Sequence, residues 1–190
     1  MIKRIFDITI AIVIFIPLVP LLLITYLTII ATSKGPAIYW SDRVGRHNKI
    51  FRMPKFRSMH INTPALATHM LSRDGKAPQY LTSIGKFIRR TSIDELPQLW
   101  SVVKGDMSIV GPRPALYNQY DLTKMRTIAG VDQLLPGITG WAQVNGRDEL
   151  SITNKVALDM EYLNRQSFWL DIKILWMTFL NVAKRDCIRH

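Results

Sequence analysis

The longest apolar stretch of the chain lies close to its N-terminus. No charged residue occurs between Ile8 and Ser33. As a straight helix this stretch would be about 39 Å long at roughly 1.5 Å per residue, which exceeds the roughly 30 Å hydrocarbon core of a bilayer. The pattern therefore predicts a membrane helix. A secretory signal peptide fits less well, because the run is longer than an h-region and no small-residue cleavage site follows it.

Two prolines interrupt the middle of this apolar run. Pro17 and Pro20 each lack a backbone N–H donor and clash with the preceding helical turn, so we expect a kink or break there. The positive-inside rule places basic flanks in the cytoplasm. Such residues flank the run on both sides: Lys3, Arg4, Lys34, Arg43, Arg46 and Lys49. A re-entrant helix that enters and leaves one leaflet satisfies both observations, and a spanning helix is the open alternative.

The pattern changes after Gly35 and Pro36, a dipeptide that favours a turn. Short periodic segments punctuated by Gly and Pro follow, with no repeats and no sign of a second soluble domain. We therefore divide the chain into a membrane helix, residues 1–34, and a membrane-associated domain, residues 35–190. The expected fold class is α/β (α+β), mostly helical, for this small domain.

Two short strands and a loop are expected first in this domain. Residues 37–42 and 49–53 have the composition of strands, and Gly45 and Asn48 lie in the loop between them. Residues 61–80 are polar and irregular, which indicates a surface loop.

Helices are expected in the remainder. "TSIGKFIRR" suggests a short helix with Thr82 or Ser83 as its N-cap. Ser92 and Glu95 fit a capping box ahead of "LPQLWSVVK", which stops at Gly105. Pro97 is tolerated only in a first turn, so the N-cap could instead lie nearer Asp94.

Two further helices end the chain. Residues 151–165 are expected to be helical with Ser151 as the cap, and residues 167–185 form a last helix that is apolar on most of its surface. The aromatic residues of this last helix, together with its basic flanks, suit an amphipathic helix in a membrane interface. They are Phe168, Trp169, Trp176 and Phe179. A buried core helix is the open alternative.

The net positive charge of the chain favours anionic partners. Lys and Arg total 25 and Asp and Glu total 14, which gives a formal net charge of +11. Such an excess attracts nucleic acid, anionic lipid or phosphorylated small molecules. The single cysteine, Cys187, cannot build a disulfide framework, so nothing indicates an oxidising compartment.

Asp94 and Glu95 stand side by side at the start of a predicted helix. A carboxylate there is stabilised by the helix dipole and by free backbone N–H groups. Two carboxylates suit Mg²⁺, which binds one or two of them together with substrate phosphates. An ionised Asp is also a competent nucleophile toward phosphorus. Alternatively, Glu95 only caps the helix and Asp94 is a surface residue favoured by the dipole.

Cations accumulate in the motifs around this pair. An arginine fork binds phosphate oxygens bidentately, and the prolines beside Arg113 would hold its backbone fixed. Any one of these cations also fits a solvated surface charge, but together they indicate a phosphate-binding site. The set comprises Lys55, Arg57, Arg89, Arg90, Arg113 and Arg147. From the residues themselves, both a nucleotide phosphate and a lipid phosphate are open as ligands.

Five motifs carry a resemblance to a known family. They are "KRIFD", "FRMPKFRSM", "RRTSIDELPQLWSVVKGDMSIVGPRP", "PGITGWAQVNGR" and "SFWLDIKIL". Together they resemble the bacterial sugar transferase family, the monotopic phosphoglycosyl transferases, from about Lys3 to Arg185. This chain is similar to the minimal form, which lacks the additional N-terminal transmembrane helices of larger relatives.

The resemblance implies a reaction and its surroundings. A sugar-1-phosphate passes from a UDP-sugar to undecaprenyl phosphate, UMP is released, and assembly of a glycoconjugate such as O-antigen, capsule, exopolysaccharide or a glycoprotein glycan begins. It also implies Mg²⁺ as cofactor, membrane lipid and downstream glycosyltransferases as partners, and no nucleic acid. The location implied is the cytoplasmic face of the bacterial inner membrane, with residues 35–190 as a cytosolic catalytic domain. A UDP-N-acetylhexosamine or a deoxyamino derivative is the expected sugar donor.

The resemblance also implies roles for single residues. Asp94 matches the nucleophile that carries a covalent phosphosugar, and Glu95 matches its acidic partner at the Mg²⁺ site. The other matches are Lys55, Arg89 and Arg113 as cations near the site, Arg147 near the nucleotide, and Asp171 as a supporting acid. The family's re-entrant helix breaks at a Ser-Pro pair, whereas this chain has Val19-Pro20 and an additional Pro17.

Two other functions compete with this one. A membrane-anchored basic module for nucleic acid or anionic lipid would explain the charge, and salt-sensitive nucleic-acid binding would support it. A lipid-linked phosphatase or pyrophosphatase would use the same Asp and Mg²⁺ but transfer the phosphoryl group to water rather than to lipid.

Overall fold

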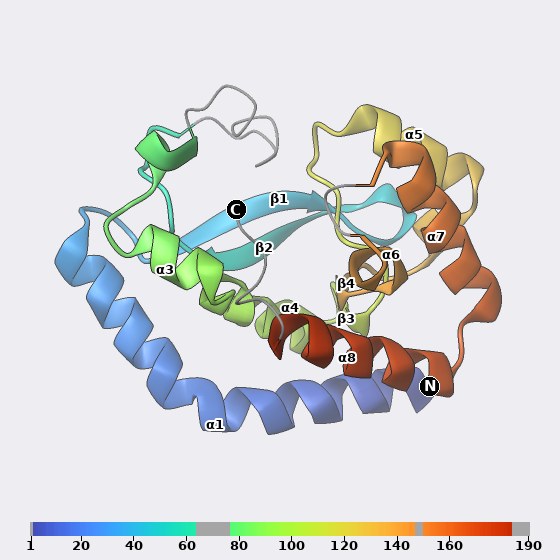
Figure 1. Ribbon diagram of the computed structural model, residues 1–190, viewed down its shortest axis with the longest axis horizontal. Coiled ribbons are helices and arrows are strands. Elements are labelled where there is room, and N and C mark those ends of the chain that lie inside the picture. Colours follow the sequence, from blue (N-terminus) through green and yellow to red (C-terminus); the bar gives the residue numbers. More distant parts are fainter. Residues whose placement is uncertain (1, 64–76, 147–149, 184–190) are drawn as a thin grey trace.

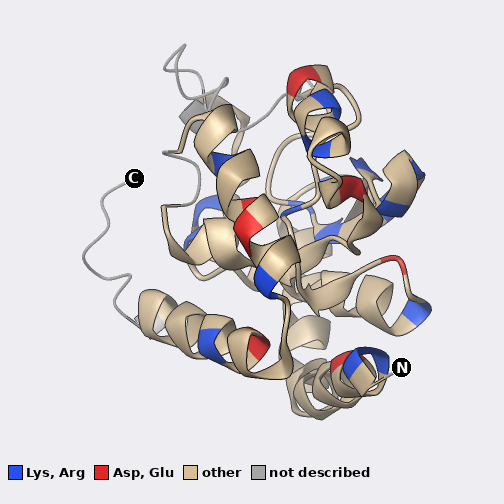
Figure 2. Ribbon diagram, turned by 90° about the vertical axis from the view of Figure 1, so that its right-hand side faces the viewer, with Lys and Arg blue, Asp and Glu red and all other residues tan. Residues whose placement is uncertain are grey.

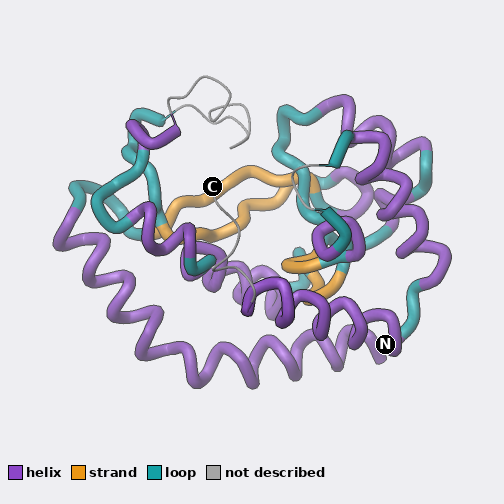
Figure 3. Tube along the Cα trace, in the orientation of Figure 1, coloured by secondary structure: helices purple, strands orange, loops and turns teal. Residues whose placement is uncertain are grey.

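The computed structural model describes residues 2–63, 77–146 and 150–183. Helices dominate and the sheets are small, so the expected mostly helical α+β class is confirmed (Figure 3). The long helix α1 (Ile2–Thr32) follows the outside of the molecule, and the rest of the chain lies on the inner side of its bend (Figure 1).

The bend in α1 has an identifiable cause. Pro17 and Pro20 lie inside this 31-residue helix, which changes direction near its middle (Figure 1). A proline in a helix removes one backbone hydrogen bond and pushes against the carbonyl four residues earlier, which kinks the helix. The expected disruption is therefore confirmed as a kink, because the helix continues through both prolines. Within the described ranges, α1 is the helix that is long and apolar enough to cross a membrane.

The N-terminal end of α1 is fixed to the domain by its polar side chains. Arg4 donates to the carbonyl oxygen of Val102 at 2.6 Å. The buried Asp7 accepts a hydrogen bond from the Ser108 hydroxyl at 2.8 Å. Ala11, one turn further along, belongs to the main hydrophobic core.

The C-terminal end of α1 is fixed to the same domain. Arg57 is buried and donates from Nη1 to the carbonyl oxygen of Lys34 at 2.6 Å, and from Nη2 to the carbonyl oxygen of Ser33 at 2.9 Å. Gly35 has a φ of +106°, and a Cβ there would lie 2.4 Å from Arg57 Nη1. Only glycine therefore suits this turn, which ends the helix as the sequence predicts.

An antiparallel hairpin follows the helix. Its strands are β1 (Ile38–Val44) and β2 (Ile50–Phe56), which overlap the predicted strands but begin one residue later and extend further toward the C-terminus. Tyr39 pairs with Lys55, and Arg43 pairs with Phe51. Because side chains alternate along a strand, Arg43 and Lys55 lie on the same face of the hairpin.

The next segments depart from the predicted capping. They are the 3₁₀ helix η2 (Ala77–Tyr80), α3 (Gly85–Arg90), the 3₁₀ helix η3 (Ile93–Gln98) and α4 (Leu99–Lys104). The N-cap of α3 is Ile84, and no side chain caps it, so Thr82 and Ser83 were wrong as caps. Ser92 has a left-handed φ of 57° and makes no capping hydrogen bond, so the capping box with Glu95 is also wrong. Gly105 does end α4, with a φ of 102°. In the predicted surface loop, residues 64–76 lie outside the described residues.

A short parallel pair of strands lies at the centre of the fold. β3 (Ser108–Val110) pairs with β4 (Gly137–Thr139), and neither strand is among those predicted from the sequence. The helices that complete the domain are α5 (Tyr120–Ile128), the 3₁₀ helix η4 (Val131–Gln133), α6 (Trp141–Val144), α7 (Ile152–Arg165) and α8 (Phe168–Ala183). Ser151 caps α7 as predicted, since its hydroxyl accepts from the Asn154 N–H at 3.2 Å.

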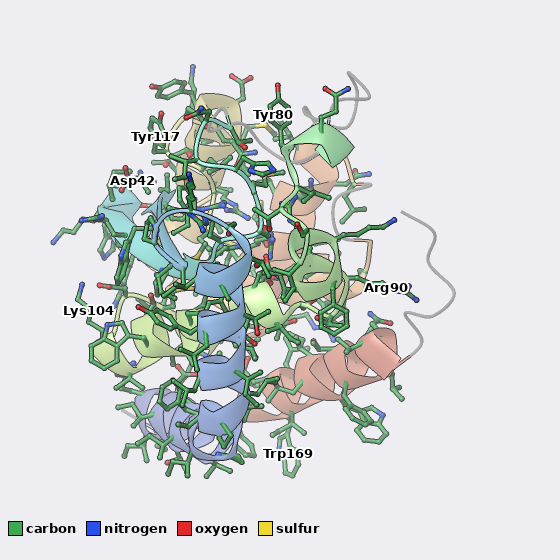
Figure 4. The ribbon with its side chains drawn as sticks, turned by 90° about the vertical axis from the view of Figure 1, so that its left-hand side faces the viewer. Asp42, Tyr80, Arg90, Lys104, Tyr117 and Trp169 are labelled. Atoms are coloured by element: carbon green, nitrogen blue, oxygen red, sulfur yellow. The ribbon has the colours of Figure 1, made fainter. Side chains whose placement is uncertain are left out.

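α8 lies beside the N-terminal arm of α1 (Figures 1 and 2). Phe168 packs edge-to-face on Phe6 of α1, with 5.2 Å between the ring centroids. Ile174 on the same helix is fully buried, whereas Trp169 is 77% exposed. α8 is thus amphipathic rather than a buried core helix. Figure 4 places Trp169 at the end of the molecule opposite Tyr80 and Tyr117.

Candidate functional site

The acid pair lies in the first turn of η3, as the sequence predicts. A 3₁₀ helix turns about 120° per residue, so the side chains of adjacent residues point in different directions. Asp94 and Glu95 therefore have separate surroundings, although both lie close to Lys55 of β2.

Glu95 is the centre of a small ion-pair network. Its Oε1 atom accepts from Lys55 Nζ at 2.8 Å and from Arg113 Nη2 at 3.1 Å. Burial alone would raise the pKa of Glu95, but Arg113 and Lys55 together hold that pKa well below its usual range. Glu95 is thus a permanent anion that fixes both cations.

At Asp94 the neighbouring cations do not outweigh the effect of burial on the pKa. Asp94 is buried, and burial raises its pKa to about 6 against the opposing effects of Lys55 and Arg89. Its carboxylate is therefore poorly solvated, which increases the reactivity of an anionic nucleophile once the charge is formed. The pKa is raised at Asp94 and lowered at Glu95. Such a difference suits one acid as nucleophile and the other as its supporting acid.

Positive charge exceeds negative charge around the pair. The cations close to it are Arg43, Lys55, Arg89 and Arg113. Burial, followed by the neighbouring Arg113, lowers the pKa of Arg43 to about 10. Such an excess suits a dianionic ligand such as a diphosphate, whose oxygens accept charge-assisted hydrogen bonds.

Arg43 is the site residue that sequence reasoning missed. Its place in the sequence indicates only a basic flank of the membrane helix. Its donor Nη1 lies 3.2 Å from the carbonyl oxygen of Pro114, beside Arg113. Strand alternation is the signal that could have identified Arg43. Tyr39 and Arg43 lie on one face of β1, and the pairing of Tyr39 with Lys55 places Lys55 on that face too.

Three of the predicted site residues lie elsewhere or outside the described residues. Arg57 binds the end of α1, as described above, and none of its recorded hydrogen bonds reaches either acid. Asp171 accepts from Lys3 Nζ at 2.7 Å and from the Tyr162 hydroxyl at 2.6 Å, near the start of α1. Burial and the bond to Asp171 raise the pKa of Tyr162. Arg147 lies outside the described residues.

The carboxylates of the acid pair are compatible with Mg²⁺ if substrate phosphates and water complete its coordination. The described part of the chain holds no group of three or more His, Cys, Asp or Glu side chains that could bind a metal by itself. Mg²⁺ commonly binds one or two carboxylates and completes its coordination with water and substrate phosphates. The buried Asp94 carboxylate, with its raised pKa, fits a neighbouring divalent cation that would favour its ionised form.

Comparisons with known proteins identify the family of the chain. The model of the family "Bacterial sugar transferase" matches residues 1–185. The undecaprenyl-phosphate galactose phosphotransferase of Salmonella typhimurium is 40% identical over 97% of this chain and 41% of its own length. The undecaprenyl-phosphate glucose phosphotransferase of Komagataeibacter xylinus is 42% identical over 93% of this chain and 35% of its own length.

A shorter relative is covered almost completely. The "Uncharacterized sugar transferase EpsL" of Bacillus subtilis is 39% identical over 99% of this chain and 90% of its own length. The chain spans about two fifths of the Salmonella and Komagataeibacter proteins. With a family match over nearly all of its residues, the chain belongs to the bacterial sugar transferase family.

Proposed function

We propose that this protein transfers a sugar-1-phosphate from a UDP-sugar to undecaprenyl phosphate, releases UMP and thereby starts glycoconjugate assembly. The observation that carries this proposal is the buried Asp94 carboxylate, which lies among cations in a member of this family. The Salmonella and Komagataeibacter relatives are named for galactose and glucose transfer to undecaprenyl phosphate, so both sugars join the N-acetylhexosamines as candidates.

The chemistry proceeds in two displacements at one phosphorus atom. An Asp94 carboxylate oxygen attacks the β-phosphorus of the UDP-sugar. The bond from that phosphorus to the bridging oxygen breaks, and UMP departs with the electron pair. An oxygen of undecaprenyl phosphate then attacks the same phosphorus, the bond to Asp94 breaks, and the carboxylate is restored. Covalent catalysis divides one difficult encounter of two anionic substrates into two separate steps.

The surrounding residues orient the substrates and offset their charge. Glu95 keeps Lys55 and Arg113 in place, and these cations with Arg43 and Arg89 attract the diphosphate. Asp94 and Glu95 would hold Mg²⁺, and the bound ion supplies positive charge to the phosphate oxygens.

We propose further that α1 is a re-entrant membrane helix, with both of its ends at the cytoplasmic face of the inner membrane. A straight helix of this length would separate its ends by about 46 Å at roughly 1.5 Å per residue, more than a bilayer core is thick. The support for re-entry is that α1 bends at its prolines and that Arg4 and Arg57 bond its two ends to one domain. The exposed aromatic face of α8 would lie in the interface beside it.

The reaction is tested with the whole protein in lipid nanodiscs. A panel of UDP-sugars is supplied with Mg²⁺ and undecaprenyl phosphate, and UMP and lipid-linked sugar are measured. Continuous UMP release should depend on the lipid, with one sugar-1-phosphate on lipid per UMP. Sugar phosphate released into water without the lipid would indicate a phosphatase, and no UMP from any UDP-sugar would contradict the transferase proposal.

The order of events gives a separate prediction. UDP-sugar and Mg²⁺ without lipid should add the mass of one sugar phosphate to the peptide that contains Asp94, because the nucleophile reacts before the acceptor binds. Addition of undecaprenyl phosphate should remove the adduct. Intact-protein and peptide mass spectrometry measure both. Suppose that the kinetics are sequential and that a measurement sensitive to a few per cent occupancy finds no adduct. That result would exclude the covalent route but would not contradict the overall reaction.

The re-entrant helix is tested by cysteine labelling. Ile2→Cys and Lys34→Cys, each made with Cys187→Ser, place a thiol beyond either end of the apolar run. In intact cells neither thiol should react with a membrane-impermeant maleimide, because both ends face the cytoplasm. Both should react once the cells are permeabilised, which is the control for reactivity. Labelling of one position alone in intact cells would mean that the helix spans the membrane.

A further inference from the structure

The segment that carries Arg113 is held by its backbone carbonyl groups. Prolines at positions 112 and 114 have no backbone N–H, so carbonyl oxygens make up most of the backbone groups by which this segment can be bound. Each carbonyl oxygen from residue 112 to residue 115 accepts a hydrogen bond from a different donor. The four pairs are Gly137 N to Pro112 at 2.9 Å, Arg126 Nη1 to Arg113 at 2.8 Å, Arg43 Nη1 to Pro114 at 3.2 Å and Val44 N to Ala115 at 3.0 Å.

The donor to Arg113 is itself fixed by a buried partner. Arg126 of α5 donates from Nε at 2.9 Å and from Nη2 at 2.7 Å to one carboxylate oxygen of Asp159 on α7. The side chain of Arg126 is 11% exposed and that of Asp159 is 2% exposed. The guanidinium is planar, so binding two of its nitrogens to Asp159 sets the direction in which the third, Nη1, points.

The side chain of Arg113 is partly exposed to solvent, so burial alone does not fix its position. It is 42% exposed, although it reaches Glu95. A small surface pocket lined in part by Pro112, Pro114 and Arg126 adjoins the segment.

We propose that the buried Arg126–Asp159 pair is a positioning device for the reaction, which acts by fixing the backbone of Arg113 so that its guanidinium meets the acid pair and the substrate phosphates. This inference rests on the proposed transferase function. Neither residue touches the acid pair in its recorded bonds, so both act through Arg113. Buried ion pairs are often replaceable by apolar residues with little loss of stability. A positioning role is therefore tested by readouts other than stability.

The test removes the pair without leaving a buried charge. Arg126→Met with Asp159→Leu, and separately Arg126→Gln with Asp159→Asn, replace both partners, so one combination is available if the other does not fold. Either should lower kcat/KM for UMP release about tenfold or more, because small displacements of a positioned group reduce turnover strongly. Lys104→Gln, which removes the ion pair between the exposed Lys104 side chain and the half-buried Asp106, is the matched control and should leave turnover unchanged.

A double-mutant cycle separates positioning from general stability. In an Arg113→Gln background the paired replacement should change kcat/KM by less than about twofold, since the group that it positions is gone. The same fold-loss in both backgrounds would overturn the proposal.

Hydrogen exchange gives a readout that does not depend on catalysis. Peptides covering residues 109–118 should exchange faster in the paired variants than in the wild type and in Lys104→Gln, while peptides of α4 and α8 keep their rates. Unchanged exchange in residues 109–118 would overturn the inference even if the transferase assay succeeds. Faster exchange there in a protein that gives no UMP with any UDP-sugar would uphold the positioning and reject the proposed function.

Discussion

Asp94→Asn is expected to reduce transfer to lipid by at least about a thousandfold, equivalent to about 4 kcal/mol in the activation free energy. The amide keeps the shape of the side chain but is a poor nucleophile and a weak metal ligand. UMP release from the whole protein, with UDP-sugar and undecaprenyl phosphate, measures the loss. Retention of more than about a tenth of wild-type turnover, a loss under roughly 1.4 kcal/mol, would exclude Asp94 as the nucleophile.

The same variant should fold at least as well as the wild type. Burial raises the pKa of Asp94 to about 6, so at neutral pH its ionised form destabilises the folded state relative to the unfolded state. A neutral amide removes that cost, and we expect a thermal midpoint equal to or above that of the wild type. Asp42→Asn is the matched control, since Asp42 is exposed on β1 and should affect neither turnover nor stability.

Arg57→Met is expected to destabilise the protein by about 3 kcal/mol or more. The substitution removes the buried charged donor to the carbonyl oxygens of Ser33 and Lys34, and these part-buried acceptors lose that partner. For a chain of this size the thermal midpoint should fall by roughly 6 to 12 °C. Differential scanning fluorimetry in detergent measures the shift.

The control for this prediction lies on β2, the strand that ends just before Arg57. Arg52 is exposed and its guanidinium lies 5.5 Å from the ring centroid of Trp40, so Arg52→Met should change stability by only a few tenths of a kcal/mol. Equal midpoints for Arg57→Met and Arg52→Met would mean that Arg57 does not fix the end of α1.

Much of the outline could be predicted from local signals. The uncharged run with its two prolines gave the bent α1, Ser151 gave the start of α7, and Gly105 gave the end of α4. Each of these features depends on a few residues that are adjacent in the sequence, so tertiary contacts have little scope to override them.

The errors arose where tertiary contacts outweigh local preference. Ser92 and Glu95 have the spacing of a capping box, but the Glu95 carboxylate is bound by Lys55 and Arg113 instead. A charge-assisted bond to two cations is stronger than a bond to one backbone N–H, so the backbone at Ser92 takes a left-handed conformation without that cap.

The candidate site could be predicted only in part for the same reason. The acid pair, Lys55 and Arg113 belong to recognisable motifs, whereas Arg57 shares a motif with Lys55 and lies at the end of α1. Strand alternation alone would put these two side chains on the same face. They diverge because the strand ends at Phe56, between them. Arg126 and Asp159 carry no local signal, because their roles depend on a contact between α5 and α7.

The pairing of β1 with β2 limits how this part of the chain can change in length during evolution. Arg43 and Lys55 face the acid pair only because both strands keep their alternation. A single-residue insertion between Phe51 and Lys55 would turn Lys55 to the opposite face and bring a neighbouring side chain inward. The connection at residues 45–49 lies outside the paired segment that carries Lys55, and it can lengthen without changing which side chains face Glu95. Relatives that share this chemistry should therefore differ in length at that connection and not within the strands.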